Sequence, residues 1–236
     1  VISVCSTDDR YADDVHYNGG AIVADQMLSW ASTMWAYNAR PQDPDVVGEG
    51  WREDWATHID DAPVNIEDWL SHQRRDSYWK HASVCEDPTA IQVPVLAVGG
   101  LLDEYRTTLF RLMETASCTV HALLGPWAHN YPHQGVPGPA IDFIAECVRW
   151  WDHWMSDVDN GVDTQPQLRA YIPDSAPVGS DIEHRPGRWI AEQRWPSSNV
   201  TPTQFTEQNG SCNGQRAQLS TAPIGTTAGS WLQFCL

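Results

Sequence analysis

The stretch of sequence that decides the fold reads VPVLAVGG (93–100), LLDEYRTTLFRLMETAS (101–117) and CTVHALLGPWAH (118–129). Its apolar runs predict short strands over 93–100 and 119–124, and its spacing predicts a helix over 104–116 between them. Asp103 follows the first strand and His129 follows the second. Because open α/β sheets bind ligands at the carboxyl ends of their strands, the stretch predicts an α/β fold with an acid and a histidine at that edge.

Asp103 and His129 have the order and spacing of the last two members of a Ser-Asp-His triad in an α/β-hydrolase. In such a triad the acid sets the tautomer of the histidine, and the histidine takes the proton of the nucleophile. Spacing alone leaves a plainer alternative open, because an aspartate after a strand often caps a helix and a loop histidine is often only exposed. The chain has no GxSxG motif, and Ser6 and Ser29 lack its strand–turn–helix setting, so we expect the nucleophilic serine to be absent.

The composition favours a globular protein and disfavours two classes of partner. The 236 residues are 42% hydrophobic and 19% charged. Fourteen basic against thirty-one acidic side chains give a net charge of −17, which repels phosphate backbones, so we expect no nucleic-acid partner. The sequence has no apolar run of about eighteen residues and no signal-peptide pattern, so we expect no membrane span and favour a cytoplasmic location.

Six cysteines are scattered along the chain without a CxxC pair or a Cys/His cluster: Cys5, Cys85, Cys118, Cys147, Cys212 and Cys235. A chain of this size does not need disulfides for stability, so free thiols are expected. A Cys5–Cys85 or Cys212–Cys235 disulfide stays open, because connectivity cannot be read from a sequence. We expect no metal site, zinc in particular, and no cofactor.

The first twenty residues combine an apolar start with an acidic loop. Val1–Val4 has the composition of the end of a strand, and CSTDDRYADDVHYNGG (5–20) is a polar loop. Its acids are Asp8, Asp9, Asp13 and Asp14. They fit either a solvated loop with a helix cap or a carboxylate at the mouth of a site for a cationic substrate.

Residues 20–90 have helical spacing and many tryptophans, which predicts a helical insertion that caps the site. Thirteen tryptophans exceed what a core of this size needs. Most of them should form the core of the cap itself, and we expect a minority to line an aromatic cavity.

The second half of the chain changes character at Gly161. Before it, PAIDFIAECVRWWDHWMS (139–156) predicts a helix that packs on the sheet through one apolar side, made of Ile141, Ile144, Cys147, Val148, Trp151 and Met155. After it, short strands such as QPQLRAYIP (165–173) predict a β-sandwich. We therefore expect an α/β domain over 1–160 with its cap at about 20–90, and the start of a sandwich over 161–236. A first strand without a lead-in and a sandwich that stops early indicate a fragment.

Five segments resemble one group of serine hydrolases: VCSTDDRYADDVHYNGG (4–20), HQRRDSYWKHASVCED (72–87), PVLAVGGLLDEY (94–105), GPWAHNYP (125–132) and RPGRWIAEQRWP (185–196). The group is the CocE/NonD family, which holds cocaine esterases, Xaa-Pro dipeptidyl-peptidases (peptidase S15) and α-amino-acid ester hydrolases. The resemblance covers nearly the whole chain. It implies a partial α/β-hydrolase with a helical cap, followed by a jelly-roll domain of the PepX C-terminal type. It also implies cleavage of acyl esters or of peptide and amide bonds through an acyl-enzyme.

The resemblance assigns the two catalytic residues present in the chain. The family's triad aspartate lies in a GGWxDGY-like motif, which Asp103 matches, although Leu101 replaces the tryptophan and Glu104 the glycine. The family's triad histidine lies in GPWxH, which His129 matches without departure, whereas His133 matches no family residue. The family's serine, in a GxSxGG elbow, and its oxyanion tyrosine belong upstream of this chain, so the isolated chain is expected to be inactive.

The resemblance also names candidate substrate-binding residues. In the α-amino-acid ester hydrolases an acidic cluster holds the substrate ammonium, and Asp14 matches one member of it. The other cluster positions fall on Tyr105 and Arg106, so a small-molecule ester or amide, or a short peptide, is the broader expectation. We expect Asp14 and Trp69 to contact this substrate in a tryptophan-lined pocket.

Two other functions remain open at this stage. The chain could be a carbohydrate- or protein-binding module that uses its tryptophan-rich cap or its sandwich. It could also be one chain of a two-chain hydrolase in which a separate polypeptide supplies the serine. A homo-oligomer is left open as well.

Overall fold

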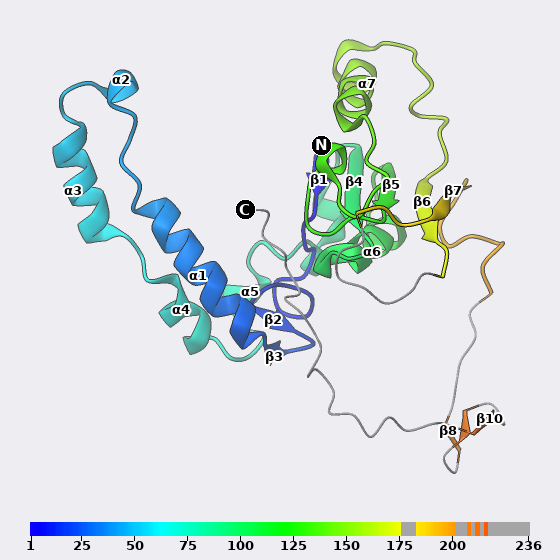
Figure 1. Ribbon diagram of the computed structural model, residues 1–236, viewed down its shortest axis with the longest axis horizontal. Coiled ribbons are helices and arrows are strands. Elements are labelled where there is room, and N and C mark those ends of the chain that lie inside the picture. Colours follow the sequence, from blue (N-terminus) through cyan, green and yellow to red (C-terminus); the bar gives the residue numbers. More distant parts are fainter. Residues whose placement is uncertain (176–182, 202–206, 209–210, 213–214, 217–236) are drawn as a thin grey trace.

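The computed structural model describes residues 1–175, 183–201, 207–208, 211–212 and 215–216. Its centre is a five-stranded sheet (Figure 1). The strands, in spatial order, are β1 (Ile2–Val4), β4 (Val95–Gly100), β5 (Val120–Gly125), β6 (Leu168–Pro173) and β7 (Gly187–Glu192). The first four run parallel and β7 is antiparallel to β6. A mixed, largely parallel sheet with helices on both faces is an α/β fold, as the sequence predicts.

Helices α6 (Thr108–Thr115) and α7 (Phe143–Ser156) pack on opposite faces of this sheet. Successive side chains of a strand point to opposite faces. Val95 and Ala97 of β4 pack against α6, whereas Leu96 and Val98 pack in the cluster that contains α7. Both β4 and β5 are therefore buried along their whole length, which explains why they are continuous apolar runs in the sequence.

The apolar side predicted for α7 is wrong in part. The helix buries Phe143 and Trp150 and leaves Ile144, Val148, Trp151 and Met155 more than a third exposed. Cys147 and Trp154 pack beside the buried pair. The helix has apolar residues on two sides, and the side with the larger aromatic rings removes more apolar surface from water when it faces the sheet.

The segment between β1 and β4 is mostly helical and extends away from the sheet (Figure 1). It begins with a small hairpin of β2 (Tyr17–Asn18) and β3 (Ala21–Ile22). The helices are α1 (Ala24–Asn38), α2 (Pro44–Val47), α3 (Trp51–Asp61), α4 (Asn65–Ser71) and α5 (Ser77–Lys80), followed by the short turns η1 (Val84–Glu86) and η2 (Pro88–Ala90). None of the helices in the described part of the chain is long and apolar enough to cross a membrane.

Only half of the six tryptophans of this helical segment lie in or against its core, fewer than the sequence predicts. Trp79 is fully buried and Trp69 nearly so, together with Tyr17 and Met27. By contrast, α3 buries none of its residues, and its Trp51 and Trp55 rings lie 6.0 Å apart on its surface. The cap thus has its own small core near the sheet and a solvent-exposed outer part.

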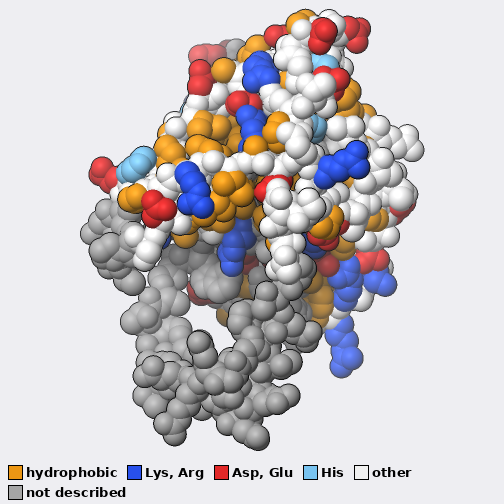
Figure 2. Space-filling view, turned by 90° about the vertical axis from the view of Figure 1, so that its right-hand side faces the viewer, with side chains coloured by type: hydrophobic (Ala, Val, Ile, Leu, Met, Phe, Trp, Pro, Cys, Tyr) orange, Lys and Arg blue, Asp and Glu red, His pale blue; other side chains and the backbone are white. Residues whose placement is uncertain are grey.

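The sheet continues past Gly161, where the sequence predicts a domain boundary. Strands β6 and β7 pair with β5 in the same sheet. On the side of the molecule that carries β7, hydrophobic side chains gather at the surface (Figure 2), and Ile172 and Trp189 are more than a third exposed. Beyond them lies a three-stranded sheet of β8 (Glu207–Gln208), β9 (Ser211–Cys212) and β10 (Gln215–Arg216). Most of 202–236 lies outside the described residues, so the jelly-roll sandwich stays a prediction.

Four of the six cysteines are described as free thiols. Cys5, Cys85, Cys118 and Cys147 form no disulfide, so the Cys5–Cys85 alternative is wrong. The Cys212–Cys235 alternative falls on residues outside the described part, because Cys235 is not among them.

Gly100 allows the loop after β5 to lie against the end of β4. A Cβ atom at this position would lie 2.0 Å from the carbonyl oxygen of Trp127. The backbone amide of Leu102 donates to the same carbonyl at 3.0 Å. Only glycine therefore permits the close approach that brings the two loops together.

We predict that Gly100→Ala lowers the free energy of unfolding by at least about 1–3 kcal/mol, because the added methyl forces the backbones of residues 100 and 127 apart. Urea denaturation measures the change. Gly50→Ala is the matched control, since the nearest atom to its added Cβ is 4.0 Å away, and it should stay within about 0.5 kcal/mol of wild type. Equal losses at the two positions would contradict the packing argument.

Candidate active site

Asp103 is held at the end of β4 by its own backbone and by the turn that follows. Its amide donates to the carbonyl of Gly100 at 3.1 Å, and its Oδ1 accepts from the amide of Tyr105 at 3.1 Å. The side chain caps the short helix η3 (Glu104–Thr107) and is fully buried. A carboxylate in this position is rigid and shielded from water.

His129 lies on the loop after β5 and meets Asp103 across the edge of the sheet. Strands β4 and β5 pair in parallel with Gly100 opposite Gly125, so their following loops start at the same level. The Nδ1 atom of His129 is 3.2 Å from Oδ1 of Asp103, and the histidine side chain is 31% exposed. The structure thus brings together the acid and the histidine that the sequence singles out, with the acid inside and the histidine at the surface.

The electrostatics of this pair keep the acid ionised. Burial by itself would raise the pKa of Asp103, but the hydrogen bond and the charge of His129, the neighbouring Cys5 thiol and the Tyr105 amide outweigh it. The net pKa lies below the ordinary value for aspartate. An ionised Asp103 favours the tautomer of His129 that carries its proton on Nδ1.

The His129 loop is anchored by the tryptophan of GPWAH. Trp127 is 1% exposed, and its Nε1 donates to the carbonyl of Pro139 at 2.8 Å. A Cβ at Gly135 would lie 2.0 Å from the indole ring, so that glycine provides space for it. His133 stacks between Tyr131 and Phe143 and takes no part in the Asp103–His129 pair.

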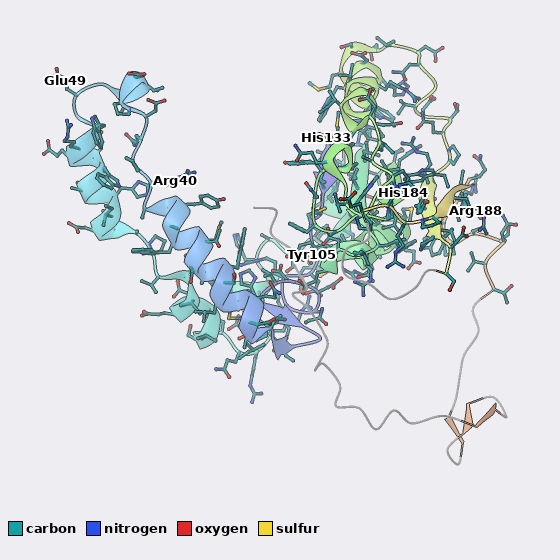
Figure 3. The ribbon with its side chains drawn as sticks, in the orientation of Figure 1. Arg40, Glu49, Tyr105, His133, His184 and Arg188 are labelled. Carbon is teal, nitrogen blue, oxygen red and sulfur yellow. The ribbon has the colours of Figure 1, made fainter. Side chains whose placement is uncertain are left out.

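Asp14 lies beside this pair in a second polar cluster. Its Oδ1 accepts from the hydroxyl of Tyr105 at 3.0 Å and from the amide of Val15 at 2.8 Å, and its Oδ2 is 2.8 Å from Nδ1 of His16. Figure 3 shows Tyr105 where the helical cap meets the sheet. Tyr105 also packs edge-on against His129, so it connects the two clusters.

A cavity of about 230 Å³ lies between these clusters, lined by Cys5, Asp14, Val15, His16, Trp30, Tyr105 and His129. Trp69 does not line it. Its ring lies behind His16, with the ring centroids 4.2 Å apart. Arg106, which with Tyr105 occupies the other acidic-cluster positions of the resemblance, donates to the backbone carbonyl of Asp103 at 2.9 Å.

His16 is a site residue that the sequence analysis missed. It is 7% exposed, and its Nε2 has no hydrogen-bond partner among the described residues. The segment DDVHY (13–17) contained one indication: Asp14 and His16 are two residues apart, and in extended backbone such side chains can point the same way. Without the fold, however, nothing distinguished this histidine from a loop residue.

The other acids of the loop serve its structure. Asp8 is 3% exposed and accepts two hydrogen bonds from Nε of Arg111, while Asp13 accepts from the NH2 group of the same guanidinium at 2.6 Å. Asp9 pairs with Arg75 at 2.7 Å. These ion pairs hold the loop against α6 and against the segment between α4 and α5. Of the four acids, only Asp14 lines the cavity.

Cys5 directly follows β1, next to the Asp103–His129 pair. Its φ is 49°, and its amide donates to the carbonyl of Val98 at 2.9 Å. Burial and then the Asp103 charge raise the pKa of the thiol well above its ordinary value. The thiol is therefore protonated at neutral pH, which argues against a role as a cysteine nucleophile in place of the missing serine.

Glu104 is a second buried acid beside Asp103. It is 4% exposed, and neither carboxylate oxygen has a hydrogen-bond partner by geometry among the described residues. Burial, followed by the charges of Asp14, Asp13 and Asp103, raises its pKa to about 7. The folded protein thus holds a proton on Glu104 up to neutral pH.

We predict that Glu104 makes the protein less stable as the pH rises from about 4.5 to 7. Its folded pKa is raised, so the folded state binds the extra proton in this window and loses that advantage above it. Glu104→Gln should therefore gain up to about 3 kcal/mol over wild type at pH 8 and little at pH 5. Urea unfolding at both pH values measures this, with the exposed Glu49→Gln as control. A gain that is equal at both pH values would argue against the buried proton.

Comparison with known proteins gives one family match and several distant relatives. Residues 1–131 match the family model of the X-Pro dipeptidyl-peptidases (S15 family). Inferred serine esterases of Mycobacterium bovis and Mycobacterium tuberculosis are each 24% identical to this chain over 118 residues, which is 48% of this chain and 16% of theirs. The chain thus spans about a sixth of the length of these relatives.

Among solved structures, a CocE/NonD family hydrolase from Staphylococcus aureus is similar, with 14% identity and a TM-score of 0.47 over 66% of this chain and 26% of that one. A second structure from Staphylococcus aureus, also a CocE/NonD family hydrolase, has 13% identity and a TM-score of 0.46. The family match covers more than half of the chain and contains the acidic loop, Asp103 and His129. This chain belongs to the X-Pro dipeptidyl-peptidase (S15) family.

Proposed function

We propose that this chain supplies the acid and the base of a Ser-Asp-His triad in a serine hydrolase of esters or of peptide and amide bonds. The observation that carries the proposal is the buried carboxylate of Asp103, 3.2 Å from Nδ1 of the partly exposed His129. Membership of a hydrolase family supports it. In this assignment Asp103 orients the imidazole and His129 is the general base.

The chemistry follows from the tautomer of His129. With its proton on Nδ1 and directed at Asp103, the ring has a free electron pair on Nε2. This nitrogen takes the hydroxyl proton as the serine oxygen attacks the substrate carbonyl, and then gives the proton to the leaving alcohol or amine. Water releases the acyl group from the serine by the same steps in reverse order. The serine is placed outside these 236 residues, since they contain no GxSxG motif.

The cavity beside His129 favours a small acyl group without a required ammonium. Both oxygens of Asp14 already accept hydrogen bonds, from Tyr105, Val15 and His16, so this carboxylate has little capacity left for a substrate cation. Trp30 and Val15 add apolar surface to the lining. Asp14 thus shapes the pocket by orienting His16 and Tyr105. Trp69 packs against His16 from behind and helps to hold its ring in place.

We predict that Asp103→Asn in the complete hydrolase lowers kcat by about four orders of magnitude, because an amide favours the wrong tautomer of His129. Steady-state hydrolysis of an activated ester measures the loss. Asp163→Asn is the matched control. Asp163 also lies beside a histidine, His153, but it is half-exposed and is no part of the Asp103–His129 pair. It should keep kcat within about twofold of wild type. A full rate in Asp103→Asn would show that another acid orients the base.

We also predict that the 236-residue chain by itself does not react with an active-serine probe such as a fluorophosphonate. His129 has no serine in a nucleophile motif to activate. Mass spectrometry of the treated chain provides the measurement, and the complete hydrolase is the positive control. Stoichiometric labelling of one serine in the isolated chain would overturn the placement of the nucleophile.

A further inference from the structure

We propose that Cys5, Asp103 and His129 form a binding site for a zinc ion at the cap-facing edge of the sheet. The thiol sulfur, a carboxylate oxygen and a ring nitrogen of these residues all lie within 4.8 Å of one another. Cysteine, aspartate and histidine are the ligand types that zinc prefers. Three protein ligands with a fourth position open to water form a common zinc arrangement.

The distances within the group suit tetrahedral coordination. Zinc holds nitrogen and oxygen ligands at about 2.0–2.2 Å, so two such ligands stand about 3.3 Å apart. The Nδ1 atom of His129 and Oδ1 of Asp103 are already 3.2 Å apart. The ion can therefore take the place of the proton between them, and the Cys5 sulfur, within 4.8 Å of the other two ligand atoms, is close enough to become the third ligand after a small movement.

An unsatisfied buried atom provides an independent indication of a ligand. Asp103 is fully buried, and among the described residues no donor lies in hydrogen-bond geometry to its Oδ2; the thiol that acts on this carboxylate is that of Cys5, itself one of the three proposed ligands. Buried carboxylate oxygens are normally paired, since an unpaired one is costly. Asp14 lines the same cavity as Cys5 and His129, so a further carboxylate lies near the group and attracts a cation.

The group is open to solvent on two sides. Cys5 and His129 both line the cavity of about 230 Å³ beside Asp14. They also both line a second cavity of about 200 Å³, formed with Val4, Asn130 and Tyr131. A hydrated ion has an entry path, and a water molecule has room at the fourth position.

Zinc binding rearranges two protons. The Cys5 thiol releases its proton to solvent as the sulfur–zinc bond forms. The proton on Nδ1 of His129 is replaced by the ion, and the ring then carries its proton on Nε2 instead. This nitrogen can no longer accept a proton, so zinc inhibits hydrolysis. Binding follows from the geometry alone, and only the inhibition rests on the proposed function.

The test is a titration of the complete protein with Zn²⁺ by calorimetry, and with Co²⁺ followed by its thiolate charge-transfer absorption. Wild type should bind one ion per chain and show the absorption. Cys5→Ser should bind about tenfold or more weakly and lose the absorption. Cys118→Ser removes a comparable partly buried free thiol and should behave as wild type. A thermal melt without metal shows whether Cys5→Ser still folds. If it does not, His129→Gln removes a second proposed ligand and provides the same test.

The outcomes separate the site from the enzyme. Binding that is unchanged in Cys5→Ser and His129→Gln, or no binding by wild type at micromolar Zn²⁺, overturns the site. Zinc inhibition of ester hydrolysis that is relieved in Cys5→Ser supports both the site and its effect. A protein that binds zinc through Cys5 but hydrolyses nothing keeps the site and refutes the proposed function.

Discussion

The parallel pairing of β4 with β5 is the constraint on which the site depends. Gly100 and Gly125 lie opposite each other at the ends of these strands, so the turn with Asp103 and the loop with His129 leave the sheet at the same level. The backbone of Trp127 then approaches Gly100 closely enough that any side chain there would clash. A shift of the register would separate the acid from the histidine, because each is fixed to its own strand end.

A set of ion pairs brings the acidic loop to this edge. Arg111 of α6 binds Asp8 and Asp13, and these contacts hold the loop that carries Cys5 and Asp14. Burial lowers the pKa of the Arg111 guanidinium, but the two carboxylates outweigh this, so its net pKa is raised and the guanidinium stays charged. Removing one partner of such a buried pair leaves an uncompensated charge, so the loop depends on all three residues.

Much of the local structure could be predicted from the sequence, and each prediction that was wrong has a physical reason. Strands β4 and β5 and the face of α6 were predictable, because apolar runs and helical spacing report burial directly. The buried side of α7 was not, since both sides of that helix are apolar. The membership of β6 and β7 in the main sheet was also not predictable, because an alternating strand looks the same in an α/β sheet and in a sandwich.

By itself, the sequence determined the α/β class, the family and the Asp103–His129 pair, because these depend on local patterns and on strand order. Only the tertiary structure decided what surrounds the pair. It placed Cys5 beside Asp103 and His129, bonded Tyr105 to Asp14, and turned His16 toward the same cavity. Such contacts join residues that are distant along the chain, and nothing in their local sequence records which loops the folded sheet brings together.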